Sequence, residues 1–254
     1  MYFYLIILLK IGENMVIEPP NPNKKFPILT IIIIMTNVII YLITTLIFSS
    51  SPFYLDETNP VVNSMIFYPS DFFALNRWYT LYTSQFLHND PLHIISNMFF
   101  VFVFFDDMEN AFGKIPALIF YLFSGVIAGM TFALFQLFMA VIYSPTNLYA
   151  ILSIGAVGAS GAIFGVLAGY GFSFPDRPLR IIGYKGTIKA KYFVLFYIAL
   201  EIIYTLIALV PGLSSGDSVA HAAHLGGFIG GLLFTYLFKI FNKKQYIRIK
   251  SLEV

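Results

Sequence analysis

The stretch IGAVGASGAIFGVLAGYGFSF, residues Ile154–Phe174, decides how this chain is built. It contains 21 residues and no charged side chain. About 20 consecutive apolar residues are needed for a helix to cross the ~30 Å hydrocarbon core of a bilayer. The stretch therefore predicts a transmembrane helix. Its six glycines indicate that this helix packs closely against its neighbours.

The composition of the whole chain agrees with a membrane protein. Of its 254 residues, 58% are hydrophobic and only 11% are charged, whereas about 25% of a typical soluble domain is charged. The net charge of +2 gives no indication of a nucleic-acid partner. The chain has no cysteine, which excludes disulfides, thiolate metal ligands and a cysteine nucleophile.

Five further apolar stretches accompany the first. Together they predict six transmembrane helices: Phe26–Phe48, His93–Met108, Pro116–Tyr143, Ile154–Phe174, Tyr192–Val210 and Val219–Phe241. We therefore expect an all-α, polytopic membrane domain over residues 26–241, preceded by an N-terminal segment (1–25) and followed by a basic tail (242–254). The long first outer loop is rich in aromatic residues between Asp71 and Phe86. We expect it to form short helices that lie partly in the outer leaflet.

Basic residues predict the orientation, because Lys and Arg collect in cytoplasmic segments. With six spans both termini lie on one side, and that side receives thirteen basic residues, whereas the opposite loops receive only Arg77. The thirteen are Lys24, Lys25, Lys114, Arg177, Arg180, Lys185, Lys189, Lys191, Lys239, Lys243, Lys244, Arg248 and Lys250. We expect a multi-pass protein with cytoplasmic termini, in the plasma membrane of a prokaryote.

Four polar residues lie at similar depth in three of these spans. At a rise of about 1.5 Å per residue, Ser160, His224, His93 and Asn97 fall roughly 6–12 Å below the outer face. Polar side chains at such depth are costly and are usually functional. Gly161, Gly165 and Gly169 form one small-residue stripe, and Gly227 and Gly231 form another. Packing of the two stripes would bring Ser160 toward His224.

These residue types suit peptide-bond hydrolysis. A serine hydroxyl becomes a nucleophile when a histidine accepts its proton, and Ser160 and His224 are candidates for these two roles. His93 and Asn97 share a helix face at i, i+4 and both can donate hydrogen bonds to a developing oxyanion. The backbone N–H of Ser160 is a further candidate donor.

Three motifs carry a resemblance to the rhomboid family of intramembrane serine proteases. They are HNDPLHIISN (His88–Asn97), GASG (Gly158–Gly161) and AHLGG (Ala223–Gly227), in the family's order and on the appropriate spans. The resemblance implies a Ser160–His224 dyad, an oxyanion hole from His93 and Asn97, and a supporting role for His88. It also assigns supporting roles to Gly158, Gly161 and Phe164, the last standing where the family often has Tyr.

The resemblance further implies an endopeptidase that hydrolyses bonds in or near transmembrane helices of membrane-protein substrates. It implies no cofactor and no metal. Three neighbouring polar residues have less defined roles. We expect His221 to face the outer loop or water, and Asp217 to cap the last span. Glu201 is expected to be paired or neutral within the fifth span.

Three other functions remain open on the sequence. A catalytically inactive rhomboid-like protein would bind or guide membrane clients without cleaving them. A metal-dependent enzyme would use the four histidines, although no HExxH pattern is present. A transporter would be expected to show repeated halves and a polar layer at mid-membrane. Retention of both Ser160 and His224 favours the protease.

Overall fold

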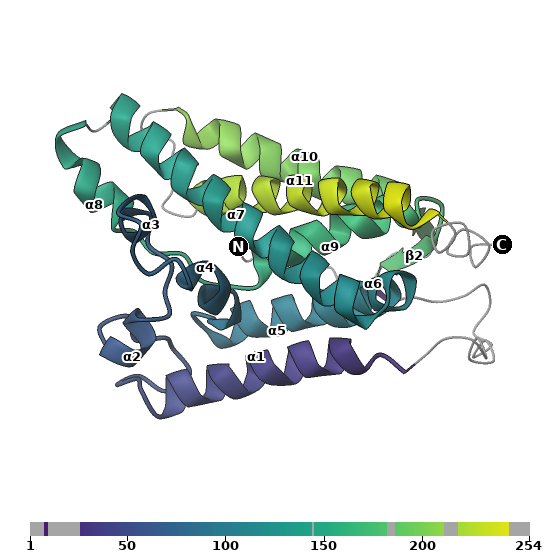
Figure 1. Cartoon of the computed structure of the whole chain (residues 1–254), viewed down its shortest axis with the longest axis horizontal. Helices are drawn as coiled ribbons and strands as arrows, with labels where there is room; N and C mark the ends of the chain where they lie inside the picture. The colour runs from purple at the N-terminus through teal and green to yellow at the C-terminus, as the bar shows by residue number, and fades with distance from the viewer. Residues whose placement is uncertain (1–7, 10–25, 144, 182–185, 211–217, 244–254) are drawn as a thin grey trace.

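The computed structural model of the chain is an α-helical bundle, described for residues 8–9, 26–143, 145–181, 186–210 and 218–243. Its long helices run roughly along one direction (Figure 1). Five helical segments have the length and apolar composition to cross a membrane. They are α1 (Ile28–Leu46), the continuous segment α5–η2–α6 (Pro91–Phe100, Val101–Phe105 and Asp106–Phe112), α7 (Lys114–Tyr143), α10 (Ala190–Ala208) and α11 (Ser218–Phe241). The chain is thus a multi-pass membrane protein.

The fourth predicted span is shorter than expected. The helix α9 covers only Ser160–Ser173 and contains 14 residues, so the count of six full-length spans is not confirmed. Residues Ile154 to Ala159 were expected to be helical, but Ala156 forms an isolated antiparallel bridge with Phe67 of the outer loop. Gly158 has a φ of 122°, a value that only glycine adopts readily. The helix therefore begins at Ser160 rather than at Ile154.

Short elements gather at the two ends of the bundle (Figure 1). At one end lie α2 (Pro60–Asn63), α3 (Pro69–Phe73), α4 (Thr80–Thr83), η1 (Ser84–Phe86), η3 (Pro145–Asn147) and α8 (Leu148–Leu152). At the other lies an antiparallel sheet of order β1–β2–β3, formed by Leu8–Leu9, Pro178–Ile181 and Thr187–Lys189. The sheet was not predicted. The short helices of the outer loop were predicted from the sequence. Within this loop the aromatic side chain of Trp78 is 65% exposed.

The helix α9 lies centrally in the bundle and packs against both α11 and α7, which also contact each other. The glycine stripes make this position possible. A Cβ atom on Gly227 would lie 2.0 Å from the carbonyl oxygen of Gly161, and one on Gly231 would lie 2.2 Å from that of Gly165. A Cβ atom on Gly161 would lie 2.4 Å from Ala128 of α7. The predicted packing of stripe against stripe is therefore confirmed.

Two carboxylates accept hydrogen bonds from the N–H groups at the starts of α1 and α5. The carboxylate of Glu109 on α6 accepts hydrogen bonds from the backbone N–H groups of Leu29 (3.0 Å) and Thr30 (2.8 Å) at the start of α1. The Asp90 carboxylate caps α5 by accepting the His93 N–H at 2.9 Å. Both carboxylates satisfy N–H groups that have no partner within the helix itself. α1 and α5 are thereby fixed in position.

Candidate active site

Ser160 is the first residue of α9, and the segment before it is fixed by the outer loop. The N–H of Gly158 donates to the carbonyl of Ser84 at 2.9 Å, and Ala156 pairs with Phe67. A side chain at Gly158 would meet His93, because its Cβ atom would lie 2.7 Å from Nε2 of that ring. Gly158 thus provides both the positive φ and the close approach of His93 to the start of α9.

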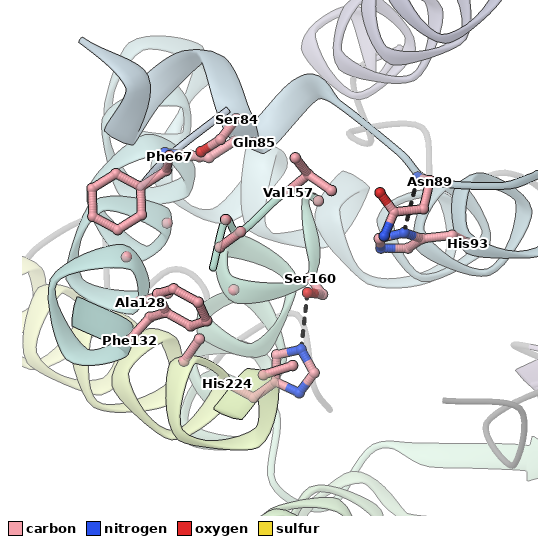
Figure 2. A pocket seen from close by; sticks show the side chains of 18 of the residues that line it. Phe67, Ser84, Gln85, Asn89, His93, Ala128, Phe132, Val157, Ser160 and His224 are labelled. Atoms are coloured by element: carbon pink, nitrogen blue, oxygen red, sulfur yellow. Dashed lines mark hydrogen bonds between the residues drawn. The ribbon is translucent and has the colours of Figure 1, made fainter. Parts of the chain in front are cut away.

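The predicted approach of Ser160 and His224 is present. Oγ of Ser160 lies 2.9 Å from Nε2 of His224 (Figure 2). The ring of Phe164, one turn into α9, stacks on the His224 ring with centroids 4.3 Å apart and an interplanar angle of 12°. His224 itself is buried. A partly buried serine hydroxyl and a buried imidazole nitrogen therefore form a hydrogen-bonded pair.

His93 and Asn97 line cavities together with this pair. The backbone N–H of Asn89 donates to Nδ1 of His93 at 3.4 Å, which assigns the ring proton to Nε2. Nε2 of His93 and Nδ2 of Asn97 are buried and have no hydrogen-bond partner within the described ranges. Buried donors of this kind are costly unless a ligand or water meets them. Both are available to an oxygen atom placed beside Ser160.

His88 lies against His93, as a supporting residue would. The two rings make an edge-to-face contact with centroids 4.9 Å apart, and His88 is fully buried. Burial lowers the pKa of His88 well below its usual range, with a further contribution from His93. A neutral His88 therefore packs behind His93 and restricts the orientation of that ring.

Two cavities meet at the serine and the histidine. The larger, of about 320 Å³, is lined by Ser160, His224 and His93 and reaches the exposed outer-loop residue Glu57. The smaller, of about 50 Å³, lies between α5, α9, α10 and α11 and is lined by Asn97 and Glu201 among others. Ser160, His93 and His224 line both. The first cavity links the pair to the end of the bundle that carries the outer loop.

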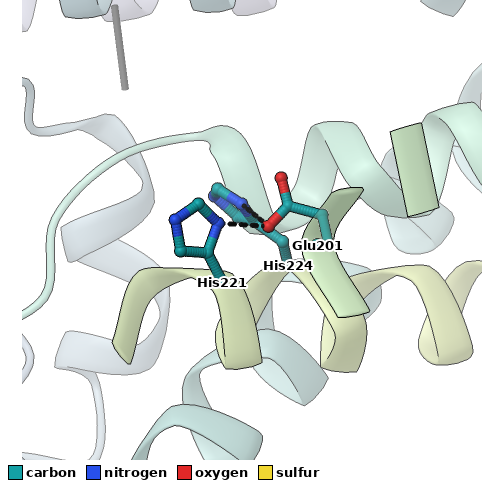
Figure 3. Close-up of side chains that lie close together, drawn as sticks. All are labelled: Glu201, His221 and His224. Atoms are coloured by element: carbon teal, nitrogen blue, oxygen red, sulfur yellow. Dashed lines mark hydrogen bonds and ion pairs between the residues drawn. The ribbon is translucent and has the colours of Figure 1, made fainter. Parts of the chain in front are cut away.

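The structure corrects the expectation for His221. This side chain is buried rather than directed to water, and its Nδ1 lies 2.6 Å from Oε2 of Glu201 (Figure 3). Its ring also stacks on Tyr204 of α10, with centroids 4.7 Å apart. Glu201 of α10 is fully buried. Because His221 pairs with this carboxylate, its side chain is directed to the interior of the bundle rather than to water. Asp217, expected to cap the last span, lies outside the described residues.

Glu201 also reaches the candidate base. Nδ1 of His224 lies 3.1 Å from the same Oε2 atom, although its alignment is outside hydrogen-bond geometry. The sequence indicated only that a carboxylate in the fifth span must be compensated. Its two partners were not identified, because they lie 20 and more residues away on another helix.

Glu201, His221 and His224 are also candidate ligands of a metal ion. Among the described residues they form a group of metal-binding side chains whose donor atoms all lie within 4.8 Å of one another. Tetrahedral zinc ligands at about 2.1 Å from the metal stand roughly 3.4 Å apart. The 2.6 Å between Glu201 and His221 is instead a hydrogen-bond distance. The arrangement thus fits paired side chains better than the ligands of a single ion.

Comparisons with known proteins identify the family. The model of the rhomboid domain matches residues 75–241, more than half of the chain. Rhomboid protease AarA of Providencia stuartii is 27% identical over 88% of this chain and 76% of its own length. The putative rhomboid protease YdcA of Bacillus subtilis is 28% identical over 68% and 73%.

Plant relatives are matched over less of their length. RHOMBOID-like protein 6, mitochondrial, of Arabidopsis thaliana is 30% identical over 64% of this chain but only 44% of its own length. The region 75–241, which the rhomboid-domain model matches, contains Ser160, His224 and the motifs around them. Together with the multi-pass helical structure, these matches establish that the chain belongs to the rhomboid family.

Proposed function

We propose that this protein is an intramembrane serine endopeptidase in which Ser160 is the nucleophile and His224 the general base. The observation that carries the proposal is the 2.9 Å contact between Oγ of Ser160 and Nε2 of His224. Membership in a family with named proteases supports the same activity. His224 accepts the hydroxyl proton as Oγ attacks the scissile carbonyl, and later donates it to the leaving amine.

The oxyanion that forms in this attack has donors available nearby. Nε2 of His93 and Nδ2 of Asn97 are buried without a partner in the described chain, and the N–H of Ser160 lies at the positive end of α9. Preorganised donors that become satisfied in the transition state lower the barrier, typically by about 100- to 1,000-fold in rate for each donor. The orphaned donors thus support a site that stabilises negative charge.

Hydrolysis of the acyl-enzyme requires water. The larger cavity extends from Ser160 to Glu57 at the outer-loop end and offers a route for this water.

The substrates we propose are transmembrane proteins whose spans contain helix-destabilising small residues, since a peptide bond must leave its helix to be attacked. We also propose a membrane domain over residues 26–241, with an N-terminal segment over 1–25 and a basic tail over 242–254.

The orientation follows from the basic residues. The start of α1, the sheet and the end of α11 share one end of the bundle, opposite α2, α3 and α8 (Figure 1). We propose that this end is cytoplasmic, because Lys114, Arg177, Lys191 and Lys239 belong to segments at this end. Location in a prokaryotic plasma membrane remains a prediction.

The test uses the full chain reconstituted in liposomes with a single-span reporter whose helix contains Gly and Ala near the outer face. Wild type is expected to cleave it, and Ser160→Ala and His224→Ala are expected to abolish cleavage. Asn97→Ala should reduce the rate about 100- to 1,000-fold. Ser153→Ala removes a serine hydroxyl outside the site and should cleave like wild type.

Equal cleavage by Ser160→Ala and wild type would contradict the nucleophile assignment. Binding of the reporter without cleavage by wild type would favour the inactive, client-binding function instead.

A further inference from the structure

The buried carboxylate of Glu201 stands behind the Ser160–His224 pair. It lies on α10, whereas the nucleophile is on α9 and the histidine on α11. Oε2 of Glu201 lies 3.1 Å from Nδ1 of His224, whose Nε2 lies 2.9 Å from Oγ of Ser160. Three side chains from three helices thus form a chain from carboxylate through imidazole to hydroxyl.

We propose that Glu201 is a positioning residue for His224, a role that rests on the proposed function of the Ser160–His224 pair. Its carboxylate favours the tautomer with a proton on Nδ1 of His224, because a negative charge beside Nδ1 attracts that proton. Nε2 is then free to accept the proton of Ser160. When His224 becomes an imidazolium ion, the same carboxylate stabilises its charge.

His221 holds Glu201 in place for this role. Its Nδ1 makes the shorter contact to Oε2, at 2.6 Å, and its ring is fixed by stacking on Tyr204. The two imidazole rings are nearly perpendicular, at 87°, so both Nδ1 atoms approach one oxygen from different directions (Figure 3). Tyr197 also faces Glu201 from one turn earlier on α10 and lines the same small cavity. The carboxylate is therefore anchored independently of His224.

A purely structural role for Glu201 is the competing explanation. In that case the carboxylate would only connect α10 to α11 through His221, and its loss would lower stability without a specific effect on chemistry. The two roles differ in what they predict for the rate of the chemical step. A positioning role affects the reaction of Ser160 even in a variant whose fold is intact.

The experiment measures labelling of the full chain in detergent by a fluorescent fluorophosphonate. In this reaction Oγ of Ser160 attacks phosphorus, fluoride leaves, and His224 takes the hydroxyl proton. The maximal labelling rate and the half-saturating probe concentration are determined separately, with the thermal unfolding temperature of each variant. Glu201→Gln is expected to reduce the maximal labelling rate by about 100-fold or more. The comparable replacement of the triad carboxylate in a serine protease lowers the rate by about 10⁴-fold.

The half-saturating concentration is expected to stay within about twofold, because Glu201 does not contact the probe's reactive group. Glu201→Asp keeps the charge and should recover part of the rate. Thr205→Val is the matched control, since Thr205 lies one turn later on α10 and its hydroxyl is buried without a partner among the described residues. It should label at the wild-type rate.

His221→Phe separates the two explanations. We expect it to lower the unfolding temperature but to retain more of the maximal rate than Glu201→Gln. A wild-type maximal rate in a folded Glu201→Gln variant, or a loss of rate in Glu201→Gln that only matches its loss of folded protein, would overturn the positioning role. Labelling that survives Ser160→Ala would instead overturn the proposed function itself, so the two failures are distinguishable.

Discussion

The helices α9 and α10 both pack on α11 and both contribute to the site, but they are held in different ways. On α9 every residue from Ala162 to Tyr170 is buried. On α10 burial is confined to one side, and exposed apolar residues such as Leu195, Ile203 and Leu206 cover the rest. α9 is thus a central helix surrounded by protein, whereas α10 is a peripheral one.

The nature of the contacts explains this difference. α9 meets α11 through backbone atoms, because a Cβ atom on Gly227 would lie 2.0 Å from the Gly161 carbonyl oxygen. α9 meets α10 through side chains, since a Cβ atom on Gly171 would lie 3.0 Å from a methyl group of Val194. The nucleophile therefore sits on a helix fixed by its backbone. Glu201 reaches the site on a helix held by adaptable side chains.

The largest effect should come from closing the gap between α9 and α11. Gly227→Ala places a methyl group against a carbonyl that cannot rotate away, and overpacking of this kind costs about 1–3 kcal/mol or more. We expect the free energy of unfolding to fall by at least that upper value and fluorophosphonate labelling to be lost. Thermal unfolding in detergent and labelling measure the two effects.

Gly171→Ala is the matched control on the α10 side. The Val194 side chain can shift by a few tenths of an ångström, and alanine favours a helix by up to about 1 kcal/mol over glycine. We expect stability close to wild type. A similar loss in both variants would contradict the contrast between backbone and side-chain packing.

A smaller effect is expected from the ring that stacks on the histidine. Phe164→Ala removes an aromatic contact worth about 0.5–1.5 kcal/mol, so the maximal labelling rate should fall about two- to tenfold in the fraction that remains folded. Phe164→Tyr keeps the stacking and should react like wild type. Val166→Ala truncates another buried side chain of α9. A comparable loss of rate in Val166→Ala would show that general loosening of α9, not stacking, sets the rate.

The smallest effect should come from the start of α10. Asp176 accepts hydrogen bonds from Lys191 at 2.9 Å and Lys189 at 3.0 Å, and these bonds hold the pKa of Asp176 below its usual range. A depressed carboxyl pKa contributes stability above the unfolded-state value of about 4, and this contribution is lost as the pH falls through the folded-state value.

Because Asp176 is exposed, Asp176→Asn should lower the unfolding temperature at pH 7 less than Gly227→Ala or Phe164→Ala does. The difference from wild type should vanish once the pH falls below the folded-state pKa of Asp176. Unfolding temperatures at pH 7 and at low pH check both statements. A difference that persists at low pH would show that the ion pairs are not its cause.

The sequence predicted the parts of the site that depend on local pattern. Glycines at four-residue spacing show which face of a helix allows close approach, and this was enough to bring Ser160 toward His224. The i, i+4 relation placed His93 and Asn97 on one face, where both now line the site. Apolar length identified the helices to within a few residues for most of the bundle.

The features that were missed depend on long-range pairing. The start of α9 was misplaced because the bridge between Ala156 and Phe67 joins segments almost 90 residues apart. His221 was expected to be exposed because its partner, Glu201, lies on another helix. A single carboxylate in an apolar span indicates that a partner exists, but not which one. Such partners become visible only when the helices are packed.

The most direct test of the central claim is to map the fluorophosphonate adduct on the full chain by peptide mass spectrometry. We predict a single adduct on Ser160, with fluoride lost, that is absent from His224→Ala and from heat-denatured protein. An adduct on a different serine, or equal modification of Ser160→Ala and wild type, would contradict the assignment of Ser160 as the nucleophile.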